Sequence, residues 1–373
     1  MSQQRAKEYN RKKVFLEIAE TMLLIAFLSL FMTCGWSASL KEFLSRFTSS
    51  FWILNGFYGL MFFLLVKVVS FPLDYYSGYT LEHTYQLSTE SFSSWIMDEL
   101  KGLGVSLLFS LIIVEIVYGL MHVSPDLWWL ITALVLNVII IIMIKLAPLI
   151  LMPIFFTFRQ VSDPDLRERL MRLTEKVHTR INGIFEMNLS KKSKSANAAL
   201  AGLGRTRRII LSDTLLKDYS HDEIEVIMAH ELGHHVHHHL WKGIFIQGTM
   251  VLLLLFIISR SMNRGLEWFH LSGIDDIAGL PYLTLISILF SLMFLPLTNL
   301  YLRHLEYQAD QYGVEVTGKR AAFIQALEKL ALQNLSDREP NPVIEFIFYS
   351  HPSIDKRTNR LSTYGHNQTT QDG

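Results

Sequence analysis

The sequence predicts a mainly α-helical membrane protein, in which about six transmembrane helices form a shell and one α+β domain lies outside the bilayer. Half of the 373 residues are hydrophobic and only 18% are charged, whereas a soluble domain usually carries about a quarter charged residues. Several apolar runs also approach the roughly 20 residues that a membrane helix needs. One long polar segment, between the fourth and fifth runs, supplies the domain outside the membrane.

The transmembrane helices are predicted from six apolar runs. These are approximately Val14–Trp36, Phe51–Phe71, Leu103–Met121, Leu127–Ile144, Ile244–Ile258 and Leu280–Tyr301. The fifth run is short and crosses the bilayer only with the help of its flanking residues. The first run is longer than the core of a secretory signal peptide and lacks a clear small-residue cleavage site, so we interpret it as a retained span.

The spans divide the chain into two predicted domains. Residues 1–157 form an N-terminal membrane domain with four transmembrane helices. Residues 158–373 form a second domain, which two further helices at about 244–258 and 280–301 interrupt.

An even number of spans places both termini on one side of the membrane. Lysine and arginine are frequent before the first span and in the stretch 159–217, so the positive-inside rule predicts that the termini and the polar segment face the cytoplasm.

The polar segment has signals for both helices and strands. Apolar spacing predicts a helix over Leu166–Ile181. The runs Ile184–Leu189 and Arg208–Leu211 are typical of short strands, with a polar turn at Lys191–Ser195 between them. The mixture predicts an α+β domain.

The motif HELGH, from His230 to His234, is the strongest chemical signal in the chain. Residues four apart share one face of a helix, so the two imidazoles can bind one tetrahedral zinc ion. Glu231 can act as the general base that takes a proton from a water activated by the ion. Ser220 and Glu223 have the spacing of a capping box and predict where this helix begins.

The histidines that follow the motif leave a second interpretation open. His235, His237, His238 and His239 continue the tract, and a histidine-rich tract can bind metal loosely without catalysis. The alternative is therefore a non-catalytic metal-binding membrane protein or transporter. Glu231 favours a hydrolase, because a metal store needs no acid between its ligands. We interpret the first three of these histidines as solvated or interfacial.

A third metal ligand is predicted after the sixth span. Catalytic zinc has three protein ligands and one open position, and Glu306 is the candidate for the third ligand. Asp310, four residues later on the same helical face, would accept the second N–H of a zinc-binding histidine and fix its tautomer. The fifth and sixth spans form a hairpin, which returns Glu306 to the side of the HELGH motif. The alternative for the two acids is an interfacial salt bridge.

These residues resemble the integral-membrane zinc metallopeptidase family that comprises type-I CAAX prenyl proteases and HtpX-type proteases. The HExxH motif, followed after two spans by E-x-x-x-D, carries the resemblance. The stretches 195–202 and 207–216 and the His-Pro-Ser motif at 351–353 with Arg357 are also similar to the family. The segment 82–89 resembles a loop between early spans of CAAX prenyl proteases and favours that subgroup.

The resemblance implies a zincin-like metallopeptidase domain that closes the cytoplasmic end of the shell and binds one Zn²⁺ per chain. It implies that His351 is catalytic and donates to the oxyanion. It also implies that Asn197, Ala198, Ala199 and Arg357 bind substrate, the first three from an edge strand to which an extended peptide adds. The alternative is that this stretch is an ordinary surface loop.

Two features depart from the CAAX prenyl proteases. Ala198, Ala199 and Leu200 occupy edge-strand positions where those enzymes favour bulky aromatic residues, and we predict six spans where they have seven. The side-chain preference for substrate is therefore open.

The predicted function is a zinc-dependent membrane endopeptidase, with CAAX-type C-termini or other membrane-associated proteins as substrates. Quality-control proteolysis of misfolded membrane proteins, as in the HtpX type, is the alternative. The expected partners are a protein or peptide substrate and the lipid bilayer. A net charge of zero gives no basic field for nucleic acid.

Overall fold

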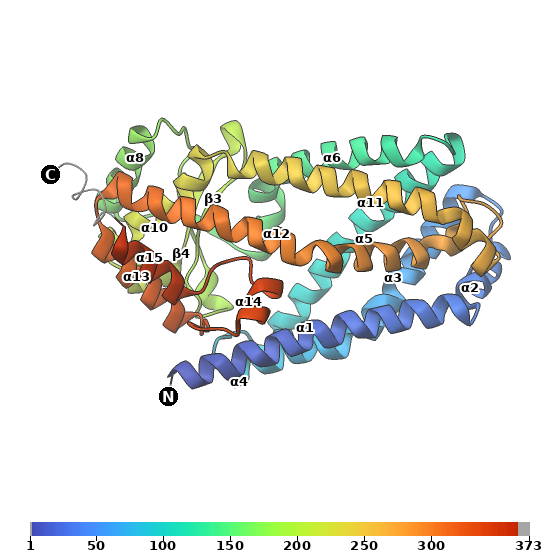
Figure 1. The fold of residues 1–373 in the computed structure, drawn as a ribbon, viewed down its shortest axis with the longest axis horizontal. Helices are drawn as coiled ribbons and strands as arrows, with labels where there is room; N and C mark the ends of the chain where they lie inside the picture. The colour runs from blue at the N-terminus through green and yellow to red at the C-terminus, as the bar shows by residue number, and fades with distance from the viewer. Residues whose placement is uncertain (1, 365–373) are drawn as a thin grey trace.

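The structure is a computed structural model that describes residues 2–364, so residues 365–373 of the second predicted domain lie outside the described part. Among the described residues, six helices are long and apolar enough to cross a membrane, which confirms the predicted number. They are α1 (Ser2–Thr33), α3 (Phe51–Tyr75), α5 (Phe92–Val123), α6 (Trp128–Leu146), α11 (His239–Phe269) and α12 (Leu280–Thr317). Figure 1 shows these helices along the long dimension of the molecule, with the sheet at one end.

The six helices close into a ring, which confirms the predicted shell. Helix α1 contacts α3, α3 contacts α5, α5 contacts α6, α6 contacts α11, α11 contacts α12, and α12 contacts α1. At the end away from the sheet, a hydrophobic core that includes Tyr58, Phe62, Tyr118 and Trp128 packs between the helices. The short helix α2 (Trp36–Ser45) packs against α1 and α3 at that end.

Several of the helices are longer than the apolar runs that predicted them. Helix α12 has 38 residues, which corresponds to about 57 Å at about 1.5 Å per residue. The hydrocarbon core of a bilayer is only about 30 Å thick. The C-terminal part of α12 therefore extends out of the membrane toward the sheet, where Figure 1 shows it beside α10. Helix α11, predicted from a short run, has 31 residues.

A four-stranded mixed sheet lies at the centre of the domain outside the ring. Its strands are β1 (Phe158–Gln160), β2 (Ile184–Met187), β3 (Ala198–Ala201) and β4 (Arg208–Ser212), in the spatial order β1-β2-β4-β3. Strands β2 and β4 pair in parallel, and the two outer pairs are antiparallel. The strands predicted at β2 and β4 are confirmed, whereas β1 was not predicted.

Helices pack on this sheet and build a second hydrophobic core. The helices of this domain are α8 (Pro164–Lys176), α9 (Asp213–Asp218), α10 (His221–Val236), α13 (Arg320–Gln333), α14 (Pro342–Phe348) and α15 (Ile354–Thr363). The core includes Leu170, Ile209, Leu211, Met228 and Phe323, all at most 1% exposed. Helix α1 begins, and α15 lies, at the same end of the molecule as the sheet (Figure 1).

Candidate active site

The HELGH motif lies on α10, whose start is fixed by the predicted capping box. The Ser220 hydroxyl accepts from the Glu223 N–H at 3.3 Å, and the Glu223 carboxylate accepts from the Ser220 N–H at 2.7 Å. These bonds satisfy two backbone donors that the first helical turn leaves unpaired. The apolar face around Ile224 is buried in the second core. Helix α12 packs against α10, on the side of His230 and His234.

Helix α12 approaches α10 closely because glycines lie at their contact. A Cβ atom on Gly233 would lie 3.1 Å from the Cα of Ala309, and one on Gly313 would lie 3.3 Å from the backbone nitrogen of His230. Contacts this short leave little room for a side chain, so glycine permits an approach that other residues would oppose. The close contact brings Glu306 of α12 beside the two histidines.

Three side chains converge as a metal site requires. The Nε2 atoms of His230 and His234 are 3.2 Å apart. The Glu306 oxygens lie 3.5 Å from His230 Nε2 and 3.3 Å from His234 Nε2. A tetrahedral zinc ion with bonds of about 2.0–2.1 Å holds such ligands about 3.3–3.4 Å apart. Among the described residues, Glu306 Oε2 is also buried without a hydrogen-bond partner, and a bound cation would satisfy this oxygen by coordination.

The charges around this cluster fit a divalent cation. The carboxylates of Glu231, Glu306 and Asp310 are accompanied by the guanidinium of Arg357, which leaves two negative charges when all are ionised. Burial alone would lower the pKa of His230, but the nearby Asp310 and Glu306 raise it to about 9. Without a cation the cluster would therefore hold an extra proton, and one zinc ion would balance its charge.

Asp310 and Arg357 lie behind His230. The Nδ1 of His230 is 2.9 Å from Asp310 Oδ1, so the carboxylate lies where a tautomer-fixing partner is expected. Arg357 donates to the same carboxylate from Nε at 2.8 Å and from Nη2 at 2.5 Å. The resemblance implied that Arg357 binds substrate. Its side chain is buried and both of these bonds go to Asp310, so Arg357 orients that carboxylate. Arg357 also lines the cavity beside Glu231, and its contact with substrate stays a prediction.

Glu231 borders two cavities. One cavity, of 450 Å³, is bounded by β3, α6, α11 and α12, and the other, of 460 Å³, by β3, α13 and the segment after α14. Glu231 lines both cavities. Burial raises the pKa of its carboxyl group, and a raised pKa suits a carboxylate that accepts protons near neutral pH.

His351 approaches the cluster from the C-terminal segment. Its Nε2 lies 3.5 Å from Glu306 Oε1, yet 65% of its side chain is exposed. The Ser350 hydroxyl is 3.0 Å from its Nδ1, and Pro352 restricts its backbone to extended conformations. An exposed imidazole beside the predicted metal ligands can contact a substrate bound there.

The segment that carries His351 is held by a residue that the sequence analysis missed. Arg303, buried on α12, donates from Nη1 to the carbonyl oxygens of Glu345 at 2.8 Å and Tyr349 at 2.5 Å. The Glu345 carboxylate in turn accepts from the Ser353 N–H at 3.1 Å. An arginine at the end of an apolar run was a visible signal, but its main-chain partners have no signature in the sequence.

Strand β3 lies at the edge of the sheet, next to α10. The Ser212 N–H donates to the carbonyl of Asn197 at 2.9 Å, whereas the Ile209 N–H donates in the opposite direction, toward β2. Bonded and unbonded pairs alternate in an antiparallel ladder. The main-chain groups of Ala198 and Leu200, which pair opposite Leu211 and Ile209, therefore point away from β4. The Asn197 side chain is exposed.

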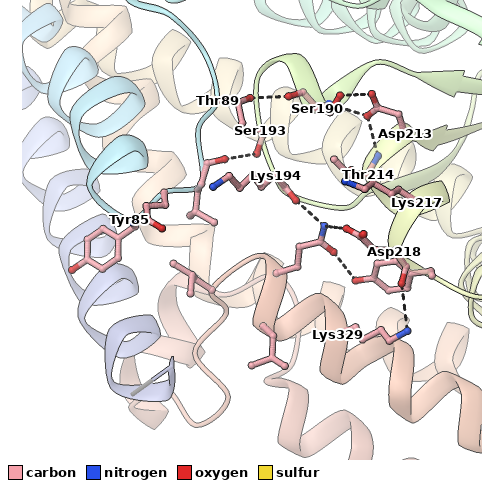
Figure 2. A pocket seen from close by; sticks show the side chains of 16 residues that line it. Tyr85, Thr89, Ser190, Ser193, Lys194, Asp213, Thr214, Lys217, Asp218 and Lys329 are labelled. Carbon is pink, nitrogen blue, oxygen red and sulfur yellow. Dashed lines mark hydrogen bonds between the residues drawn. The ribbon is translucent and has the colours of Figure 1, made fainter.

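A larger cavity, of 890 Å³, lies away from these groups (Figure 2). Its lining contains several lysines and aspartates but, among the described residues, none of the predicted metal ligands. Thr89, in the loop after α4 (Glu82–Thr84), donates from its hydroxyl to the Ser190 carbonyl at 2.8 Å and from its N–H to the Lys192 carbonyl at 3.1 Å. These contacts join the loop to the sheet domain, so we assign this region to the junction and not to the active site.

Two family sequence patterns cover the chain. The pattern of peptidase family M48 matches residues 160–364. The pattern described as the CAAX prenyl protease N-terminal, five membrane helices, matches residues 2–157. Within the latter range, the described residues form four helices that could span a membrane.

Known proteins are similar to most of the chain. An uncharacterized metalloprotease of Bacillus subtilis strain 168, YhfN, is 28% identical over 94% of this chain and 83% of its own length. CAAX prenyl protease 1 of Saccharomyces cerevisiae is 29% identical over 80% of this chain and 69% of its own. The crystal structure of S. mikatae Ste24p matches 96% of this chain and 89% of its own with a TM-score of 0.87. The sequence identity to Ste24p is 22%, so this similarity shows the fold alone.

Proposed function

This chain belongs to peptidase family M48, and from that premise we propose that it is a zinc-dependent endopeptidase that cleaves CAAX-type C-termini or other membrane-associated proteins. The observation that carries the proposal is the convergence of His230, His234 and Glu306 within 4.8 Å of one another, with Glu231 beside them. This arrangement provides three ligands for one ion per chain and a carboxylate base at the same point.

Each side chain has a distinct task in the proposed reaction. His230, His234 and Glu306 would hold zinc, which when bound supplies a Lewis acid that polarises a carbonyl and makes water more acidic. Glu231 takes the proton of the attacking water and delivers it to the leaving amine. His351 donates an N–H to the carbonyl oxygen while negative charge develops on it. Removing such a donor typically costs about 3–4 kcal/mol of transition-state stabilisation.

The substrate would bind as an added strand along β3. The outward main-chain groups of Ala198 and Leu200 can pair with an extended peptide, and the exposed amide of Asn197 can hold one of its amide groups. A peptide in this position would run from one cavity to the other across Glu231. The cavity near α6 and α11 is mostly apolar in its lining, with Ile144 among its residues, and suits an apolar or lipid-modified part of the substrate.

The active site is proposed to face the cytoplasm. Basic residues are concentrated at the start of α1, which lies at the same end of the molecule as the sheet (Figure 1). Lysine and arginine near membrane spans favour the cytoplasmic side. A substrate with a lipid-modified C-terminus on that side would meet the site at the membrane surface.

The test compares purified wild-type protein with Glu231→Gln in liposomes. The reporters are a farnesylated CAAX peptide, the same peptide with serine in place of its cysteine, and an unfolded membrane protein. We expect wild type to cleave, and Glu231→Gln to keep its zinc but lose at least about 10²-fold in rate. Glu168→Gln, which changes an exposed carboxylate on α8, is the matched control and should behave as wild type.

The outcomes separate the candidate substrates. Preference for the farnesylated peptide supports the CAAX activity, and cleavage of the unfolded protein alone supports quality-control proteolysis. Unchanged cleavage by Glu231→Gln would remove Glu231 from the mechanism.

A further inference from the structure

His234 has a partner on the side of its ring that faces away from the metal cluster. The Nδ1 of His239 lies 3.0 Å from the Nδ1 of His234. The Nε2 of His239 lies 3.0 Å from Oε1 of Gln308, and the Gln308 Nε2 lies 3.0 Å from His304 Nε2. Four side chains from α10, α11 and α12 thus form a continuous line of hydrogen bonds that starts at a predicted metal ligand.

The geometry excludes His239 as a ligand of the same ion. The atoms that converge are the Nε2 atoms of His230 and His234 and a Glu306 oxygen. His239 instead approaches Nδ1 of His234, a different nitrogen from the one in the cluster. It is therefore placed to act on the ligand and not on the metal.

Metal binding at His234 would fix the proton positions along this line. When Nε2 gives its lone pair to an ion, Nδ1 carries the hydrogen and is a donor. The Nδ1 of His239 is then the acceptor, so its Nε2 carries the hydrogen and donates to Gln308. The Gln308 amide in turn donates to His304. Each group has one consistent role, and every donor points away from the metal cluster.

We propose that His239 is the positioning residue for His234, and that Gln308 supports it by fixing its tautomer. The proposal rests on the zinc site of the proposed function and adds to that site a residue outside the ligand set. The two histidine ligands are then supported differently. His230 faces the charged Asp310, whereas His234 faces an imidazole that is only 5% exposed.

A break between two helices makes this contact possible. Helix α10 ends at Val236 and α11 begins at His239. In an unbroken helix, a residue five positions after His234 would point about 140° away from it. His238 adopts a left-handed backbone conformation with φ 56° and ψ 30°, which is uncommon and unfavourable for a residue with a side chain. This turn directs His239 back toward His234.

The experiment measures zinc release from the full-length, zinc-loaded protein into a chelator. We expect His239→Leu to release zinc about 10–100-fold faster than wild type, the usual effect of losing such a support. His239→Asn keeps an acceptor near the Nδ1 position and should restore most of the retention. His235→Leu, in the same tract but without a hydrogen bond to a metal ligand among the described residues, should release zinc as wild type does.

Two further measurements test the role of His239: the Co²⁺ absorption spectrum and zinc release from a Gln308 variant. With Co²⁺ in place of zinc, the absorption spectrum of His239→Leu should keep its shape, whereas a changed coordination spectrum would make His239 a ligand and overturn the proposal. If His239→Leu does not fold, Gln308→Met should still release zinc faster than wild type. Wild-type release from both Gln308→Met and His239→Leu would refute it. A wild-type protein that binds no zinc would instead contradict the proposed function.

Discussion

Replacing Asp310 by asparagine should weaken the metal site and destabilise the fold. Asp310 is 2% exposed, lies 2.9 Å from His230 Nδ1 and accepts two bonds from Arg357. Asparagine keeps the shape but loses the charge, and one side of its amide would present a donor to other donors. Removing one partner of a buried ion pair costs about 3–5 kcal/mol. Arg357 Nη2 is also 3.9 Å from Glu306, so part of the attraction between Arg357 and nearby carboxylates is preserved in Asp310→Asn. We therefore expect the substitution to lower the free energy of unfolding by about 3 kcal/mol.

The assay combines chemical unfolding in detergent micelles with zinc release into a chelator. Asp310→Asn should lose about 10–100-fold in zinc affinity. The double variant Asp310→Asn/Arg357→Met removes both charges and should be less destabilised than the sum of its two single variants, because the two residues are in contact. Losses of unfolding free energy that simply add in the double variant, or wild-type zinc affinity in Asp310→Asn, would refute the assignment of Asp310 as the support of His230.

Three further predictions test catalysis, substrate binding and topology. His351→Phe should lower turnover about 100-fold or more and leave zinc content unchanged by metal analysis; loss of zinc would make it a ligand or a structural support. Ala198→Pro removes an N–H that faces away from β4 and should weaken peptide binding without unfolding, whereas Ala199→Pro removes a ladder donor and should destabilise the sheet. Equal effects of the two substitutions on peptide binding and on stability would contradict the proposal that substrate binds as a strand along β3. In a chain without Cys34, a cysteine at Ser190 should react with an impermeant reagent only from the cytoplasm, and labelling from the opposite side would reverse the orientation.

Features that depend on neighbours along the chain could be predicted from the sequence. Each of these features depends on residues that are close together along the chain: the apolar runs, the capping-box spacing of Ser220 and Glu223, and the HELGH motif. The ends of the spans were less predictable, because helical hydrogen bonding does not stop where the hydrocarbon ends. Helix α12 therefore continues to Thr317 and carries Glu306 beyond its apolar run.

Features that depend on approach between distant segments could not be predicted. The hydrogen bonds from Arg303 go to main-chain carbonyls. These acceptors cannot be recognised from the sequence, because any residue can supply a carbonyl. Arg357 and Asp310 meet only because α15 packs against α12. His239 was visible as part of a histidine tract, but its contact with His234 depends on a left-handed residue between two helices. That conformation is uncommon at a residue other than glycine, and the sequence does not single out His238 from the other histidines of the tract.

The order of the metal ligands along the chain has a consequence for biogenesis. His230 and His234 are synthesised before the hairpin of α11 and α12, and Glu306 lies on α12, the second helix of that hairpin. The ligands can meet only when both helices have inserted side by side, so an unfinished or misinserted chain has an incomplete metal site. We therefore expect the three ligands to bind an ion together only after α11 and α12 have inserted, so that membrane integration precedes activity.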